Sequence, residues 1–160
     1  MAEFRSLTRK NQEISEEECI ELLKNTKRGV LSVLGDEGYP YGSPINHYYN
    51  EEDGKIYFHG GMSGHKVDAM KRCDKVSFCV MDDGEQLNGD WFLTFRSVIV
   101  FGRMELIEDM ETIREVSTKL SYKFTDDTGY IEDEIRRSGQ RTLMYALNIE
   151  NICGKVVKER

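Results

Sequence analysis

The residues best suited to chemistry lie in one stretch, residues 56–70, which reads IYFHGGMSGHKVDAM. The β-branched and aromatic residues at its start are typical of a strand, and the glycines that follow allow backbone N–H groups to approach a ligand closely. Ser63 is a good N-cap for a helix that carries Val67 and Met70. Because helix N-termini attract anions, the stretch predicts a cradle for a phosphate group.

The spacing of these glycines limits the kind of phosphate ligand that is expected. Neither the G-x-x-x-x-G-K-[ST] loop nor the G-x-G-x-x-G fingerprint can be aligned with the stretch, so a nucleoside triphosphate is not expected. The alternative interpretation is an ordinary glycine-rich turn between a strand and a short helix, because one Lys at the start of a helix is common.

Length and charge bound the class of protein. A chain of 160 residues is expected to form a single domain over residues 1–160. Its formal net charge of -7 argues against nucleic acid and anionic membranes as partners, because phosphate backbones bind basic faces. We find no apolar run long enough to span a membrane and no signal-peptide pattern at the start, so a cytoplasmic protein is expected.

The cysteines and histidines lack the spacing of a metal site. No C-x-x-C pair occurs, and the closest two cysteines, Cys73 and Cys79, have a spacing that no common zinc site uses. We therefore expect no metal and four free thiols. The residues concerned are Cys19, Cys73, Cys79, Cys153, His47, His59 and His65.

The elements that must position the stretch follow from periodicity and turn signals. A capping box at Ser15 predicts a helix that ends near Asn25, and Asp-Gly pairs mark turns between strands. Strands are expected over residues 29–34, 39–49, 56–60, 76–80, 91–107 and 143–149, and Val156 and Val157 are candidates for a last strand. Helices are expected over residues 66–70 and 109–123, and a further short helix is expected to end at Ile135.

The run from Trp91 to Ile107 carries apolar residues on both faces, interrupted by Arg96 and Ser97. A strand with one face in water would alternate instead, so both faces are expected to be buried. Because the first strands are joined by short turns, the roughly seven predicted strands favour an antiparallel barrel over a parallel sheet.

Four segments, in this order, resemble the pyridoxamine 5′-phosphate oxidase-like split-barrel superfamily, and most closely its nitroimidazole-resistance (Nim) branch. They are GYPYGSPIN (38–46), IYFHG (56–60), SGHK (63–66) and FRSVIVFG (95–102). The resemblance spans roughly residues 15–157 and implies a mainly β (α+β) fold, a six-stranded antiparallel split β-barrel with flanking helices. It also implies a homodimer with FMN sites at the interface, each built from both chains.

The resemblance assigns the cofactor's phosphate to Lys66 and to the N–H groups after Ser63, including that of Gly64. His65 is a further donor, at a position where the broader family often has Arg. Arg96, expected to be buried, needs an anionic partner, which is either the cofactor or a carboxylate such as Glu105 or Asp90. Ser97 is similar to a strand position whose hydroxyl helps to hold FMN in relatives.

The remaining candidates would surround the flavin ring. The segment Ser43, Pro44, Ile45 and Asn46 resembles the strand along the ring, with an ordinary edge strand as the alternative. His59, followed by Gly60, resembles the Nim active-site histidine, and its ordinary pKa near 6.5 would allow proton supply at neutral pH. Trp91 is either a core residue or an aromatic that covers the flavin of the partner chain.

These features imply an FMN-binding oxidoreductase that reduces small acceptors such as nitroimidazoles or other nitroaromatics. NAD(P)H is a possible electron donor, although no second glycine-rich loop is evident for its phosphates. The alternatives are a flavin-binding protein without turnover, acting as a sensor or store, and a protein that binds the deazaflavin F420 or haem.

Overall fold

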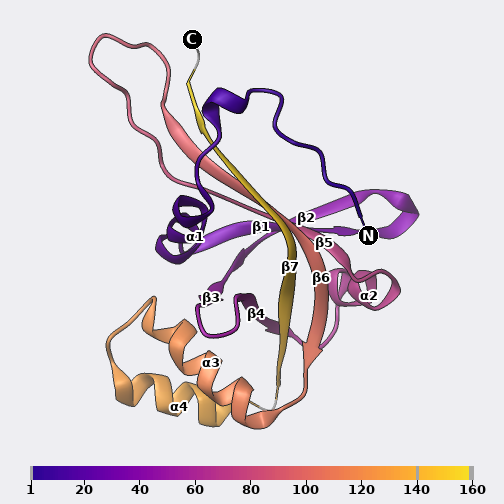
Figure 1. The fold of residues 1–160 in the computed structure, drawn as a ribbon. Helices are drawn as coiled ribbons and strands as arrows, with labels where there is room; N and C mark the ends of the chain where they lie inside the picture. Colours follow the sequence, from indigo (N-terminus) through magenta and orange to yellow (C-terminus); the bar gives the residue numbers. More distant parts are fainter. Residues whose placement is uncertain (1, 140, 159–160) are drawn as a thin grey trace.

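The computed structural model describes residues 2–139 and 141–158. In this part of the chain, seven strands form one antiparallel sheet in the order β2-β1-β5-β6-β7-β4-β3, which curls into a half-barrel flanked by four α-helices (Figure 1). The strands are β1 Arg28–Leu34, β2 Pro40–Asn46, β3 Tyr48–Asn50, β4 Lys55–Gly61, β5 Lys75–Met81, β6 Phe95–Ile107 and β7 Thr142–Val157. The helices are α1 Glu16–Asn25, α2 His65–Arg72, α3 Met110–Tyr122 and α4 Thr128–Ser138, with short 3-10 turns η1 Lys10–Gln12 and η2 Asp36–Gly38.

The expected split barrel is confirmed, with one strand more than the six implied. The segment 39–49, predicted as one strand, forms two strands, and these lie at opposite edges of the sheet. β2 pairs with β1, whereas β3 pairs with β4. The break falls at His47, whose ring is fully buried and whose Nε2 donates to the carbonyl of Leu23 at 2.8 Å. This contact with α1 fixes the bend that closes the barrel.

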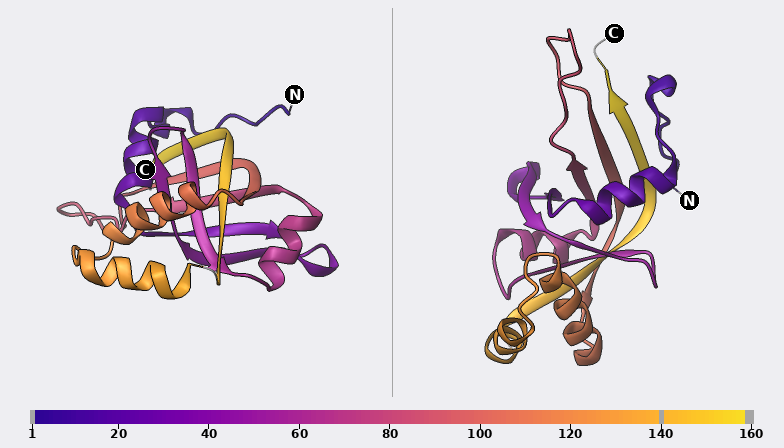
Figure 2. Two further views of the ribbon diagram at one scale, coloured as in Figure 1. Left: turned by 90° about the horizontal axis from the view of Figure 1, so that it is seen from below. Right: turned by 90° about the vertical axis from the view of Figure 1, so that its left-hand side faces the viewer.

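A long ribbon of β6 and β7 runs through the molecule (Figure 2). The prediction of a strand buried on both faces is wrong for the single chain. The strand begins at Phe95, and Val98 and Val100 are fully buried while Ile99 and Phe101 are 44% and 42% exposed. The pattern of apolar residues alone cannot show whether a face is covered by the same chain or by another molecule.

The predicted helices are confirmed with small shifts at their ends. Ser15 and Glu18 form the predicted capping box of α1, and Leu23 is buried beneath it. Asp109 and Asp127 cap α3 and α4 through their side chains. Among the residues described, none of the helices is long and apolar enough to cross a membrane.

The buried His47 predicts a pH-dependent stability. Burial and the nearby Lys123 lower its pKa from 6.5 to about 4, so between these values the unfolded chain binds a proton that the folded chain does not. The free energy of unfolding should therefore fall as pH drops from about 6.5 to 4, by up to about 1.4 kcal/mol per pH unit from this group.

Urea unfolding of wild type and His47→Gln between pH 7.5 and 4.5 measures this contribution, because the other titrating groups are common to both proteins. The wild type should lose more stability on acidification than the variant. If the free energy of unfolding falls equally in the two proteins as the pH drops, His47 is not held in its neutral form.

Candidate functional site

The strand β4 leads directly into the predicted cradle. It pairs with β7 up to Gly61, and α2 begins four residues later at His65. The prediction that Ser63 caps this helix is wrong. The N-cap is Gly64, whose φ of 140° favours glycine, and no side chain among the described residues caps the helix. The first N–H groups of α2 therefore remain available to an external anion.

Lys66 stands in the first turn of α2 and is partly buried. Desolvation lowers the pKa of its ammonium group, and none of the ion pairs found in the described part of the chain involves it. A partly buried lysine without a counter-ion beside an uncapped helix N-terminus is an arrangement that a phosphate dianion would complete.

His65 is held by the turn between β1 and β2. The backbone N–H of Asp36 donates to its Nε2 at 3.0 Å, and the ring of Tyr41 stacks on it with centroids 4.2 Å apart. In the neutral ring this leaves the proton on Nδ1. His65 can thus donate one hydrogen bond, which is the role predicted for it in the cradle. The sequence did not indicate that Asp36 and Tyr41 would hold its ring in place.

His59 lies opposite Met144 of β7, on the side of β4 that faces the two helices α3 and α4. It lines a cavity of about 760 Å³ together with Asn46 and Thr142. The residue is exposed, yet desolvation by the surrounding protein lowers the pKa of its imidazole. The neutral ring is therefore favoured at pH 7, where it can donate one hydrogen bond and accept another.

The segment 43–46 presents its side chains to two different sides. Ser43 pairs with the fully buried Leu31 and faces the barrel interior, as does Ile45. The hydroxyl of Ser43 is buried and has no partner among the described residues. Pro44 and Asn46 face outward, and Asn46 accepts a hydrogen bond from Nε of Arg28 at 3.0 Å. Alternate residues of this segment, rather than all four, can therefore meet the same ligand.

Three predicted site residues lie far from the cradle. Arg96 and Ser97 lie at the start of β6, paired with Val156 and Lys155 of β7, and Trp91 lies in the loop before this strand. Helix α2 lies beside the other half of the ribbon (Figure 1). The expectation that Arg96 is buried is wrong, since its side chain is exposed. Glu105, one carboxylate considered for it, bonds to Lys55 at 2.6 Å instead.

Trp91 is 82% exposed and precedes the strand, so the alternative that it is a core residue is also wrong for the single chain. The structure thus divides the predicted residues into two groups within one chain. One group comprises residues 43–46 and 59–66, and the other comprises Trp91, Arg96 and Ser97.

Sequence reasoning missed the walls of the cavity beside His59, which come from α3 and α4. Their residues show the ordinary pattern of amphipathic helices, which identifies the packed face and carries no sign of a cavity. It also missed Asp36, which is 29 positions from His65. Tyr41 lies within the GYPYGSPIN segment, which the sequence had already indicated as one of the segments typical of the family.

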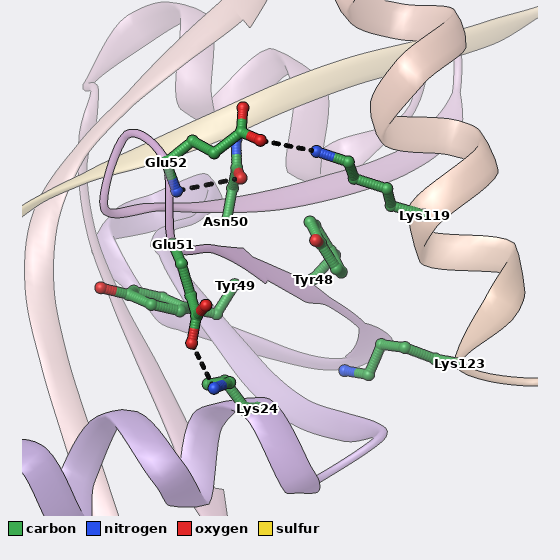
Figure 3. Close-up of a pocket in the computed structure, with 8 residues that line it drawn as sticks. All are labelled: Lys24, Tyr48, Tyr49, Asn50, Glu51, Glu52, Lys119 and Lys123. Atoms are coloured by element: carbon green, nitrogen blue, oxygen red, sulfur yellow. Dashed lines mark hydrogen bonds and ion pairs between the residues drawn. The ribbon is translucent and has the colours of Figure 1, made fainter.

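A smaller pocket of about 240 Å³ lies between α1, β3 and α3 (Figure 3). Its lysines already have partners. Lys24 pairs with Glu51, Lys119 pairs with Glu52 at 3.5 Å, and Lys123 donates to the carbonyls of Thr26 and His47 at 2.8 and 2.6 Å. These contacts join the surrounding elements, and we assign the pocket a structural role.

The described residues contain no group of three or more His, Cys, Asp or Glu that could hold a metal ion. All four cysteines are free thiols, as predicted, although only Cys19 is fully buried. Burial raises the pKa of the Cys19 thiol to about 11, which keeps it protonated and unreactive at neutral pH.

The family model described as pyridoxamine 5′-phosphate oxidase matches residues 15–156. The chain belongs to this family. No curated protein matches the sequence. Membership confirms the resemblance that the ordered segments of the sequence indicated.

Solved structures share the fold of this family member at low sequence identity. A candidate 5-nitroimidazole antibiotic resistance protein from Bacteroides thetaiotaomicron superposes with a TM-score of 0.74 at 21% identity, over 90% of this chain and 86% of that one. The conserved hypothetical protein Rv2991 from Mycobacterium tuberculosis gives 0.80 at 18% identity, over 94% and 90%. An FAD binding protein from Mycobacterium smegmatis gives 0.67 at 19% identity, over 92% and 99%.

Proposed function

We propose that the protein binds FMN and passes electrons from the reduced flavin to small acceptors such as nitroimidazoles or other nitroaromatics. The observation that carries this proposal is the uncapped N-terminus of α2 with Lys66 in its first turn. The flavin would supply the redox chemistry. The chain would bind its phosphate, orient it and hold protons near the acceptor.

The cradle favours FMN over FAD. One helix N-terminus and one lysine without a partner match a single terminal phosphate. Arg72, another cation on α2, already pairs with Asp36 at 3.1 Å. It would have to break this ion pair to bind a second phosphate. The names of the structural relatives, one an FAD binding protein and one a candidate nitroimidazole resistance protein, support a flavin and this class of acceptor.

The proposal includes a homodimer. The outer face of the sheet exposes apolar side chains on neighbouring strands. Val30 and Ile99 lie in register on either side of Cys79, and Met81 and Phe101 are exposed on the same face. A contiguous apolar face of this kind is typical of an interface. If two copies pair through it, Trp91, Arg96 and Ser97 of one copy can complete the cradle of the other, which one chain cannot do alone.

NAD(P)H is the electron donor we propose, and its binding would be transient because the sequence shows no second glycine-rich loop.

The absorption spectrum of natively purified protein separates the proposed flavin protein from its alternatives. Flavin bands support it, whereas a haem Soret band or a colourless protein that cannot be reconstituted with FMN would contradict it.

Lys66→Ala tests the cradle. Loss of a charge-assisted contact with the phosphate should cost about 1.5–3 kcal/mol, so FMN affinity should fall roughly 10- to 100-fold. Riboflavin, which lacks the phosphate, should bind almost as well as before. Fluorescence titrations with both flavins give the two affinities.

Lys71→Ala is the matched control, since Lys71 lies on the same helix but is exposed in its last turn. It should leave both affinities unchanged. Equal weakening of FMN and riboflavin by Lys66→Ala would mean that Lys66 has a structural role and that the phosphate lies elsewhere.

His59→Asn tests the proposed role of His59 as a proton donor or as a hydrogen-bonding contact of the acceptor. Asn retains part of the hydrogen bonding of the strand position, so the fold and most FMN binding should persist. Acceptor-dependent reoxidation of the reduced protein should slow at least about tenfold, because positioned acid–base groups typically contribute about 10²–10⁴-fold. Stopped-flow absorbance and thermal melting measure the two effects. An unchanged reoxidation rate together with a lowered melting temperature would remove His59 from the active site.

A further inference from the structure

The cavity beside His59 has the size and composition of a small-molecule site. Its volume of about 760 Å³ falls within the range of about 300–1,000 Å³ that is typical of such sites. It lies where α3 and α4 run side by side below the end of the sheet (Figure 2). Apolar side chains contribute much of its lining, among them Ile113, Leu120, Phe124, Ile131 and Ile135.

The walls of this cavity are held in place by contacts of their own. Leu120 of α3 and Ile131 of α4 are each 2% exposed. The hydroxyls of Tyr122 and Thr128 bond to each other at 3.0 Å and join the end of α3 to the start of α4. The cavity is therefore preformed and does not require a partner chain to shape these two walls.

Its position separates it from the phosphate cradle. His59, Asn46 and Thr142 are the sheet residues that line it, whereas Lys66 and His65 do not. Along β4, the cradle begins just after Gly61, only two residues beyond His59. A molecule in the cavity would thus contact the proposed proton donor without competing for the phosphate contacts.

Three hydroxyl groups of the lining already donate their protons within the protein and so face a ligand as hydrogen-bond acceptors. Thr118, Ser121 and Thr142 each donate their proton to the carbonyl oxygen four residues earlier, at 2.8, 2.7 and 2.9 Å. Their oxygens can still accept bonds from a ligand. The imidazole N–H of His59 supplies a hydrogen-bond donor.

The charges of the lining balance. Arg114 and Arg136 are matched by Glu132 and Glu134, and Arg136 also pairs with Asp133 at 3.6 Å. A cavity whose charges balance gives an anionic ligand no net attraction to offset its desolvation, whereas the apolar walls favour a flat, uncharged ring.

We propose that this cavity is the acceptor site, and that it selects neutral, planar, nitroaromatic-like acceptors over anionic ones of the same shape. This inference rests on the proposed function. Ser117 lines the cavity from the middle of α3 and is only partly buried, so a larger side chain there can fill the site without replacing a core residue.

Isothermal titration of the FMN-loaded, oxidised protein with 4-nitrobenzamide and with 4-nitrobenzoate tests the proposal. Wild type should bind the neutral amide at least about tenfold more tightly than the anion. Ser117→Trp should weaken amide binding at least about tenfold and leave FMN affinity unchanged. If this variant does not fold, Ser121→Trp fills the same cavity one turn later and is measured in the same way.

Glu111→Trp is the matched control, because Glu111 is exposed on the same helix and does not line the cavity. It should bind both compounds as wild type does. FMN binding together with unchanged amide binding in the filled variant would overturn the cavity as acceptor site, and tighter binding of 4-nitrobenzoate would overturn the selectivity. Failure of the wild type to bind FMN would instead overturn the proposed function, and with it the role of the cavity.

Discussion

The close approach of two backbones at Gly102 is the constraint on which the rest of the structure depends. A Cβ atom at this position would lie 2.1 Å from the carbonyl oxygen of Asn148, so no other residue fits without moving β7. The register shifts between Phe101 and Gly102, and this bulge lets the long β6 and β7 strands stay paired while they curve. The ribbon then offers β5 one edge and β4 the other.

This ribbon also explains why the predicted site residues fall into two separate groups within one chain. Its length separates the start of β6, with Arg96 and the preceding loop that carries Trp91, from the helix α2 that carries Lys66 (Figure 1). The same ribbon exposes Ile99 and Phe101 to solvent. Pairing of two copies through that face would cover the apolar side chains and bring the separated groups together. One interface would therefore account for both the exposed apolar face and the separation of the two groups.

Features set by neighbouring residues could be predicted from the sequence. The capping box of Ser15 and Glu18, the strand before the glycines and the helix after them depend on contacts a few positions apart. The N-cap at Gly64 was missed because Ser and Gly both favour that position, and only the backbone angle distinguishes them.

Features set by distant contacts could not be predicted in the same way. The break at His47 follows from its bond to Leu23, 24 positions earlier, and the exposure of Arg96 follows from where the ribbon ends. For the site, the sequence predicted the contiguous residues from His59 to Lys66, and the structure places them at the end of β4 and the start of α2. The cavity was not, because it depends on how α3 and α4 pack below the sheet, and the pattern of each helix alone does not contain that information.

A subunit-mixing experiment with Lys66→Ala and Arg96→Ala tests most directly whether two copies build each flavin site. Each variant alone should bind FMN weakly. When equal amounts are unfolded together and refolded, random pairing should restore tight binding to about one site in four, because half of the dimers then carry one site with both residues intact. Recovery of no tight site in the mixture, or wild-type FMN binding by Arg96→Ala alone, would contradict the account.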